Sequence, residues 1–143
     1  MKNNLHRFIE AQERDYEQAL AEIRNGRKRS HWMWYIFPQI KGLGFSSTSK
    51  YYALEDLNES EQYIQHPVLG VRLREISNAL LKLDTDDPKK VLGSPDDLKL
   101  KSSMTLFSEV PSADPVFKKV LEKFFGGKKD DKTREILQKK TSP

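Results

Sequence analysis

The first long pattern in the chain is LHRFIEAQERDYEQALAEI, residues 5–23. Its apolar side chains recur at helical spacing, namely Leu5, Phe8, Ile9, Tyr16, Leu20 and Ile23. Such spacing places them on one face of an α-helix, and that face must pack against other elements. Gly26 follows, at a position where glycine commonly ends a helix. The segment therefore predicts an amphipathic helix that ends near residue 25.

Signals typical of helix starts recur along the rest of the chain. A capping box pairs a polar residue with an acid three positions later, and proline fits the first helical turn. These signals are Asn58 with Glu61, Pro67, Ser94-Pro95 and Asp114-Pro115. The connector 84–96 is expected to hold one short helical turn, and a last helix is expected over about 132–138. The sequence predicts a mainly α, compact single-domain multi-helix fold over 1–143, with at most one short strand or extended aromatic segment and a frayed basic tail at 139–143.

Composition excludes several classes of function. The 143 residues include no cysteine, which rules out disulfides, thiolate metal sites and cysteine nucleophiles. No apolar run approaches the ~20 residues that span a bilayer, and the N-terminal residues have no apolar signal core. We therefore expect a cytoplasmic protein with no membrane partner, no metal and no cofactor.

The positive charge is uneven along the chain. Residues 118–143 hold nine Lys and Arg against four acids and therefore carry a net charge of +5. The other residues carry −1, and the two parts together give the net charge of +4. A second basic cluster immediately precedes an aromatic run and consists of Arg24, Arg27, Lys28 and Arg29. Basic clusters of this kind are typical of solubilising surfaces and of nucleic-acid contacts, and the sequence leaves both interpretations open.

The most unusual segment is HWMWYIFPQIKGLGFSSTS, residues 31–49. Its aromatic residues follow neither a helical nor a strand period, so it is either a short strand over 32–37 or an ordered loop. The structural interpretation is a buried segment that crosses the core. The glycines of GLGFSSTS indicate a tight turn. The functional interpretation is the wall of a ligand pocket, because aromatic faces bind bases, sugars and cations. Trp32, Trp34 and Gln39 are then ligand-binding candidates, and His31 is the candidate general acid or base because imidazole titrates near neutral pH.

A second polar segment is SPDDLKLKSSMTLF, residues 94–107. On a helix, Asp96, Lys99 and Ser103 lie on neighbouring turns, with Ser102 and Thr105 beside them. This edge could line a polar pocket together with the aromatic segment. The alternative is a solvated face whose i,i+3 ion pair contributes only ~0.3–0.5 kcal/mol.

Four motifs together resemble one family. SHWMWYIFPQIKGLG, QHPVLGVRL, DDLKLKSSMTLF, and FFGG followed by D-x-x-T are similar, in this order, to the domain of unknown function 1810, and the likeness runs from about Leu5 to Leu137. The resemblance implies a compact, mainly helical cytoplasmic domain, common in bacteria, without an established reaction. Some members are labelled calpastatin-like, which implies an extended inhibitory peptide, whereas the apolar patterns here predict a globular domain.

Two functional hypotheses follow from these segments. In the first, the aromatic segment and the 96–107 helix form a pocket for a nucleotide-like or phosphorylated anion, which Arg27, Arg29 and Lys99 attract. The residue set is catalytic His31 and Asp96 and ligand-binding Arg29, Trp32, Trp34, Gln39, Lys99, Ser102, Ser103 and Thr105. If this protein is an enzyme, hydrolysis or transfer with His31 as acid or base and Asp96 as its orienter is the simplest chemistry. In the second, the basic clusters bind nucleic acid or a protein without catalysis. The oligomeric state stays open.

Overall fold

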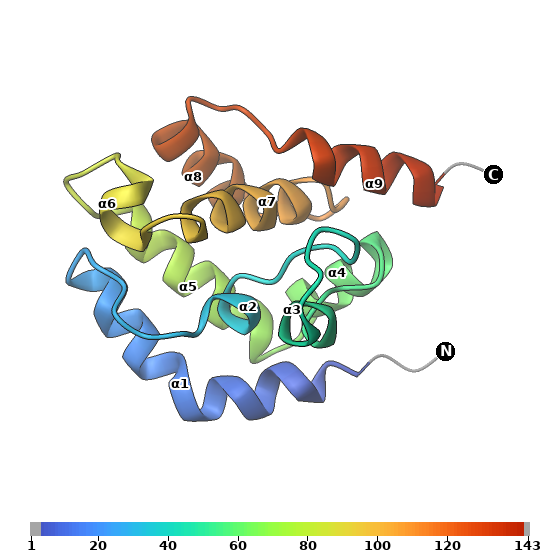
Figure 1. Ribbon diagram of the computed structural model, residues 1–143, viewed down its shortest axis with the longest axis horizontal. Coiled ribbons are helices and arrows are strands. Elements are labelled where there is room, and N and C mark those ends of the chain that lie inside the picture. Colours follow the sequence, from blue (N-terminus) through green and yellow to red (C-terminus); the bar gives the residue numbers. More distant parts are fainter. Residues whose placement is uncertain (1–3, 142–143) are drawn as a thin grey trace.

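In the computed structural model, which describes residues 4–141, all the regular elements are helices (Figure 1). They are α1 (His6–Arg24), α2 (Met33–Ile36), α3 (Ser47–Tyr51), α4 (Leu57–Gln65), α5 (Leu69–Leu81), α6 (Pro88–Leu92), α7 (Asp96–Ser108), α8 (Pro115–Phe125) and α9 (Asp131–Thr141). The prediction of a mainly α fold is therefore confirmed. The amphipathic helix predicted over 5–23 is α1, which ends one residue later than Ile23.

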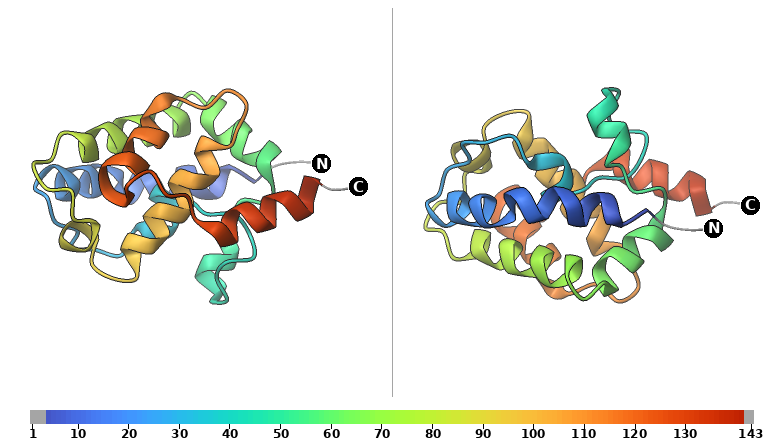
Figure 2. Two further views of the ribbon diagram at one scale, coloured as in Figure 1. Left: turned by 90° about the horizontal axis from the view of Figure 1, so that it is seen from above. Right: turned by 90° about the horizontal axis from the view of Figure 1, so that it is seen from below.

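Helix α7 crosses the middle of the molecule and packs against α4, α6, α8 and α9 (Figure 1). The neighbouring α5 packs against α1, α4 and α8, and Figure 2 shows α1 and α5 side by side. Four aromatic rings with no exposed surface join four of these helices: Phe8 of α1, Tyr63 of α4, Phe107 of α7 and Phe117 of α8. Their successive centroid distances are 5.1, 5.4 and 5.7 Å. These contacts connect the helices through one continuous core.

The predicted helix start at Asp114 is confirmed, and the one at Ser94 is wrong. Asp114 Oδ1 accepts a hydrogen bond from the backbone N–H of Val116 at 2.8 Å, and a proline occupies the first turn of α8. Helix α7 instead begins at Asp96 without a side-chain cap. Backbone carbonyls of the preceding loop accept its first N–H groups, which leaves no capping role for the Ser94 hydroxyl.

Helices α4 and α5 also begin at other residues than predicted. Asp56 caps α4 in place of Asn58, because its Oδ1 accepts a hydrogen bond from the backbone N–H of Glu59 at 2.8 Å. The helix expected from Pro67 begins at Leu69. Both errors arise because several polar residues and prolines near one helix start satisfy the same sequence rule.

The aromatic segment is not a strand. Residues 33–36 form the single helical turn α2, and the only pairing of extended backbone in the described residues is an isolated parallel bridge between Ile40 and Leu54. An extended chain would direct both indoles to one side, whereas this turn separates them. Trp32 is 1% exposed and belongs to the core, while Trp34 is half-buried. Only the second indole is thus available to a ligand.

Gly70 sets the distance between α5 and the end of α4. A Cβ at this position would lie 1.8 Å from the carbonyl oxygen of Ile64. We expect Gly70→Ala to lower the free energy of unfolding by about 2–3 kcal/mol, because relief of this clash moves two packed helices apart. Urea denaturation measures the loss.

Gly126→Ala is the control for this prediction. No atom lies within 4 Å of a Cβ built on Gly126, so only its left-handed backbone, with φ +62°, adds a cost of about 1 kcal/mol. A loss for Gly70→Ala no larger than for this control would contradict the proposed clash.

The C-terminal helix is longer than predicted. Helix α9 continues to Thr141 instead of ending near Gln138, so the expected frayed tail over 139–143 is helical up to that residue, and positions 142 and 143 lie outside the described residues. Asp130 starts α9, because its Oδ2 accepts hydrogen bonds from the Thr133 backbone N–H at 3.0 Å and hydroxyl at 2.6 Å. Across the described residues, no helix combines the length and the apolar character that crossing a bilayer requires.

Candidate functional site

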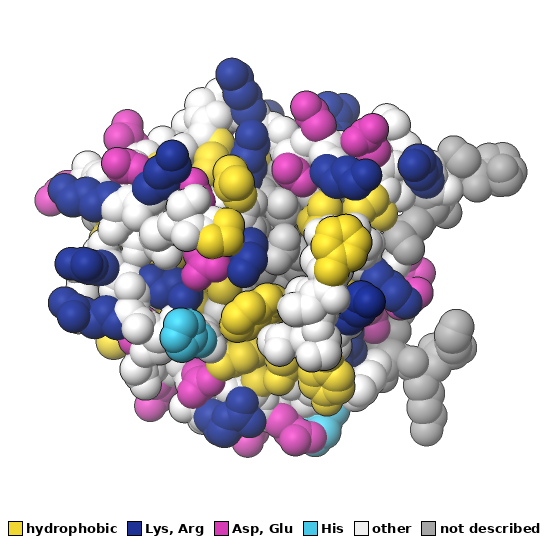
Figure 3. Space-filling model, in the orientation of Figure 1, with side chains coloured by type: hydrophobic (Ala, Val, Ile, Leu, Met, Phe, Trp, Pro, Cys, Tyr) yellow, Lys and Arg dark blue, Asp and Glu magenta, His cyan; other side chains and the backbone are white. Residues whose placement is uncertain are grey.

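An open hollow of about 530 Å³ lies between α2 and α3. It is lined by His31, Trp34, Tyr35, Ser47, Thr48, Tyr51 and Tyr52, and we call it the aromatic hollow. Hydrophobic side chains are exposed on this face of the molecule, over α2 and α3 (Figure 3). The hollow thus offers aromatic rings, hydroxyl groups and an imidazole to solvent at one place.

Ring contacts hold the walls of the aromatic hollow in place. The Tyr52 ring lies 5.1 Å from Tyr35 and 4.8 Å from Tyr51, measured between centroids. The Tyr35 hydroxyl donates a hydrogen bond to Asp15 of α1. Burial raises the pKa of Tyr35, and the hydrogen bond to the Asp15 carboxylate raises it further. Tyr35 therefore stays protonated and serves as a structural donor.

A cluster of charges joins the aromatic segment to α7, and we call it the Lys28–Asp96–Lys99 cluster. Asp96 Oδ1 lies 3.2 Å from Lys99 Nζ, and Asp96 Oδ2 lies 3.0 Å from Lys28 Nζ. Each ammonium group also lies over an indole: Lys99 Nζ is 4.7 Å from the ring centroid of Trp34, and Lys28 Nζ is 5.1 Å from that of Trp32. One carboxylate between two cations leaves one net positive charge beside Trp34.

Glu22 anchors the loop that carries the basic residues. Its buried carboxylate accepts hydrogen bonds from the Trp32 indole N–H at 2.9 Å, the Arg29 backbone N–H at 2.8 Å and the Ser30 hydroxyl at 2.7 Å. Burial by itself raises the pKa of Glu22, but the hydrogen bonds outweigh it and lower the pKa to about 2. Glu22 is therefore an anion that fixes Trp32 and directs the Arg29 side chain outward, where it is exposed.

The two predicted catalytic residues lie in different surroundings. His31 lines the aromatic hollow and is exposed. Asp96 pairs with two lysines, and within residues 4–139 no hydrogen bond or ion pair joins it to His31. The acid or base role of His31 stays a prediction, and the Asp96 carboxylate is already engaged as the partner of Lys28 and Lys99.

The predicted hydroxyl edge of α7 is not brought to the hollow. Ser102, Ser103 and Thr105 are buried, because neighbouring helices cover α7 on several sides. The Ser102 and Thr105 hydroxyls donate to backbone carbonyls one turn earlier at 3.2 and 2.8 Å, and Thr105 Oγ1 also accepts from the Asp130 backbone N–H at 2.9 Å. Gln39 is half-buried, and its backbone carbonyl accepts a hydrogen bond from the Leu54 backbone N–H at 2.9 Å. Of the predicted ligand-binding residues, Trp34 lines the hollow, and Lys99 contacts the Trp34 ring without lining the hollow itself.

Sequence reasoning missed the second wall of the aromatic hollow. Ser47 and Thr48 belong to the segment interpreted as a tight turn, Tyr51 and Tyr52 follow that segment, and α3 was not predicted. The available signal was two adjacent tyrosines directly after a run of hydroxyl residues. Lys28 was recognised as part of a basic cluster but not as a partner of Asp96.

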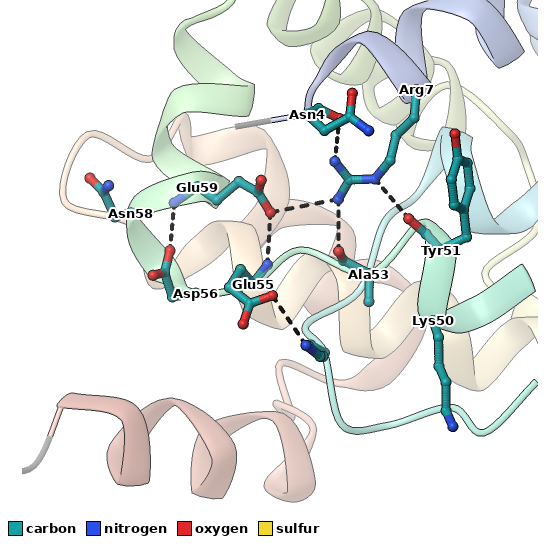
Figure 4. Close-up of a pocket in the computed structure, with 10 residues that line it drawn as sticks. Asn4, Arg7, Lys50, Tyr51, Ala53, Glu55, Asp56, Asn58 and Glu59 are labelled. Atoms are coloured by element: carbon teal, nitrogen blue, oxygen red, sulfur yellow. Dashed lines mark hydrogen bonds and ion pairs between the residues drawn. The ribbon is translucent and has the colours of Figure 1, made fainter. Parts of the chain in front are cut away.

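A further hollow of about 660 Å³ lies between the start of α1 and the segment that joins α3 to α4. Figure 4 shows the Arg7 guanidinium reaching into this segment. Arg7 Nε donates to the Tyr51 carbonyl at 2.7 Å, Nη2 donates to the Ala53 carbonyl at 2.8 Å, and Nη2 lies 3.6 Å from Glu59 Oε1. A third nitrogen donates to the Asn4 carbonyl. Because its donors are used inside the protein, Arg7 fastens α1 to the α3–α4 segment.

Comparison with known proteins places the chain in a family. The crystal structure of the conserved hypothetical protein Rv1873 from Mycobacterium tuberculosis at 1.38 Å is similar, with 41% sequence identity and a TM-score of 0.92, and the match covers 94% of this chain and 96% of that chain. No curated protein matches. The family model described as "Protein of unknown function (DUF1810)" matches residues 2–137, which is nearly the whole chain. This chain therefore belongs to that family of proteins of unknown function.

Proposed function

We propose that this chain binds a small anionic ligand in the aromatic hollow. A planar ring or a sugar face of the ligand lies against Trp34, and its negative charge lies near Lys99. The observation that carries the proposal is that Trp34 lines a hollow of about 530 Å³ and that Lys99 Nζ, although Lys99 does not itself line the hollow, lies 4.7 Å from the centroid of the Trp34 ring. A cation and an aromatic surface are thus presented together, as a nucleotide or a phosphorylated sugar requires.

The other lining groups support this ligand class. Small-molecule sites combine apolar and aromatic walls with a few polar groups that fix orientation. Here Tyr51 and Tyr52 supply further ring surface, and the exposed Ser47 and Thr48 offer hydroxyl donors and acceptors. The net positive charge of the Lys28–Asp96–Lys99 cluster favours an anion over a neutral ligand.

We further propose that His31 acts as a general acid or base if the bound ligand is a substrate. As an exposed imidazole at the hollow, it is placed to exchange a proton with a bound ligand or with water. In hydrolysis of a phosphoester, His31 accepts a proton from the water whose oxygen attacks phosphorus. The imidazolium then returns that proton to the leaving oxygen. The reaction class is hydrolysis or, with another acceptor in place of water, transfer.

The non-enzymatic alternative draws on basic residues that are spread over the molecule. The loop after α1 lies at one end of the long axis and α9 lies at the other, while α8, which carries Lys118, Lys119 and Lys123, lies between them (Figure 1). This arrangement therefore does not favour binding of nucleic acid to one flat surface that includes both clusters.

Ligand titration with tryptophan fluorescence tests the proposal. Because Trp32 is core and Trp34 is half-buried, a ligand in the hollow changes mainly the Trp34 signal. We expect a saturable change with at least one member of a panel of nucleotides and sugar phosphates. Calorimetry should show that Trp34→Ala binds this ligand at least about tenfold more weakly than the parent protein, or by ~1.4 kcal/mol. His31→Gln should retain binding and abolish any turnover.

Phe45→Ala is the matched control, because this aromatic residue is 85% exposed and does not line the hollow. A flat response to the whole panel by fluorescence and by calorimetry, with folding retained, would overturn the proposal. Equal weakening by Trp34→Ala and Phe45→Ala would also count against the assigned position.

A further inference from the structure

A separate hollow of about 620 Å³ opens between the loop after α1 and the short helix α6, and we call it the basic hollow. The two segments are distant in the sequence but are joined by a hydrogen bond from the Lys28 N–H to the Val91 carbonyl at 2.7 Å. Gly26 and Gly93 line the hollow and turn the chain with positive φ angles of 80° and 75°. A Cβ built on either glycine would meet no atom within 4 Å, so both turns are open to solvent.

The side chains around the basic hollow have one sign of charge. Its ionisable lining residues are Arg27, Lys28, Lys89 and Lys90, and none of the acidic residues in the described part of the chain lines it. Lys28 is 8% exposed and already faces Asp96. The side chains of the other three are exposed and form no ion pair or hydrogen bond with residues 4–139.

Two other hollows that lysines border have acidic residues in their walls. Glu55, Asp56 and Glu59 line the hollow beside Arg7, and Glu75 lines a hollow that Lys82 borders. Three uncompensated cations around one concave surface repel each other, and a multiply charged anion between them removes that repulsion. The hollow therefore selects for high charge density in a compact ligand.

We propose that the basic hollow binds a short chain of phosphate groups. Arg27 contributes a guanidinium, whose fork geometry suits phosphate oxygens, and the two lysines contribute point charges from the opposite wall. A nucleoside triphosphate and an inorganic oligophosphate both carry this chemistry. The site is independent of the aromatic hollow, so it stands or falls separately from the function proposed above.

Nucleic acid is the less favoured polyanion for this site. Duplex binding requires a basic stripe that follows a long backbone, whereas these cations gather around one concave surface between two turns. Aspartates also flank the approach to α6, since Asp86 and Asp87 are exposed just before it. An extended nucleic-acid backbone would pass close to these acids and be repelled by them. A compact ligand inside the hollow need not contact them.

Isothermal titration calorimetry at low salt in phosphate-free buffer tests this site, with tripolyphosphate as the first probe. We expect tripolyphosphate to bind the parent protein at least tenfold more tightly than inorganic phosphate. The double variant Lys89→Gln/Lys90→Gln should weaken tripolyphosphate at least tenfold. Trp34→Ala should leave tripolyphosphate binding unchanged, which separates this site from the aromatic hollow.

The control variant is Lys118→Gln/Lys119→Gln, which removes the same charge from two adjacent exposed lysines of α8 that do not line the hollow. It should leave tripolyphosphate binding within about twofold of the parent. ATP is the second probe, and binding of ATP that is lost in the Lys89/Lys90 variant would identify a nucleotide as a source of the phosphate chain. Circular dichroism melting checks that each variant is folded.

Three results would overturn the proposal. The first is no heat of binding with tripolyphosphate at any salt concentration. The second is equal weakening by the two double variants, which would indicate a general charge effect. The third is a single-stranded oligonucleotide that binds while tripolyphosphate neither binds nor competes, which would assign these cations to a nucleic-acid surface.

Discussion

Replacing Glu22 with alanine is expected to lower the free energy of unfolding by about 3–5 kcal/mol. The carboxylate accepts hydrogen bonds from the Trp32 indole N–H, the Arg29 and Ser30 backbone N–H groups and the Ser30 hydroxyl, at 2.7–3.1 Å. Without it, several donors at a buried position lose their acceptor, and each loss costs about 1–3 kcal/mol. Chemical denaturation measures the change.

Glu17→Ala is the matched control for this change, since Glu17 lies on the same helix and is exposed. It should alter stability by no more than about 0.5 kcal/mol. If both variants unfold at the same denaturant concentration, the Glu22 hydrogen bonds are not the anchor of this loop.

The same carboxylate predicts a pH dependence. Its pKa is about 2 in the folded protein against an ordinary value of 4.5, so the unfolded chain binds the proton more tightly. The stabilisation is fully present above about pH 4.5 and is lost as the pH falls towards 2, with a total of about 3 kcal/mol. Over this interval the parent should lose about that much more stability than Glu22→Gln. Parallel pH profiles for the two proteins would show that Glu22 titrates normally.

Phe107→Ala is expected to lower the free energy of unfolding by about 4 kcal/mol. The ring has no exposed surface and contacts both Tyr63 and Phe117, so its removal leaves a cavity where α4, α7 and α8 meet. Urea denaturation with an unchanged slope measures the loss. Phe45→Ala, at a ring that is 85% exposed, should cost less than about 0.5 kcal/mol. A comparable loss at both positions would contradict this account of the core.

The long helices could be predicted because each buries one face. Helix α1 and helix α8 carry apolar side chains at helical spacing, and Asp114 caps α8 as its sequence indicates. The turn α2 could not be predicted in this way, since it depends on contacts made at a distance. Glu22 holds Trp32 before the turn, and Asp15 holds Tyr35 within it. Neither partner is close in sequence to the residue it fixes.

The candidate site was predicted only in part for a similar reason. The pairing of Trp34 with Lys99 agrees with the expectation that the aromatic segment and the 96–107 helix meet. The serines and threonine predicted to line the pocket from that helix do not reach it, because residues 102–107 are all buried. A hydroxyl that donates to a carbonyl of its own helix has the same sequence signature as one that faces a ligand. Only the packing of neighbouring helices distinguishes the two.

The hydrogen bonds of Arg7 also help to position the aromatic hollow on the other side of α3. The backbone carbonyl of Tyr51 accepts a hydrogen bond from this guanidinium, and Tyr51 also lines the aromatic hollow. The wall of the aromatic hollow is thereby positioned from α1, although none of residues 4–30 lines that hollow. Truncating the protein past Arg7 would release this wall, although none of the described residues removed lines the hollow, so protein for ligand screens should retain Arg7.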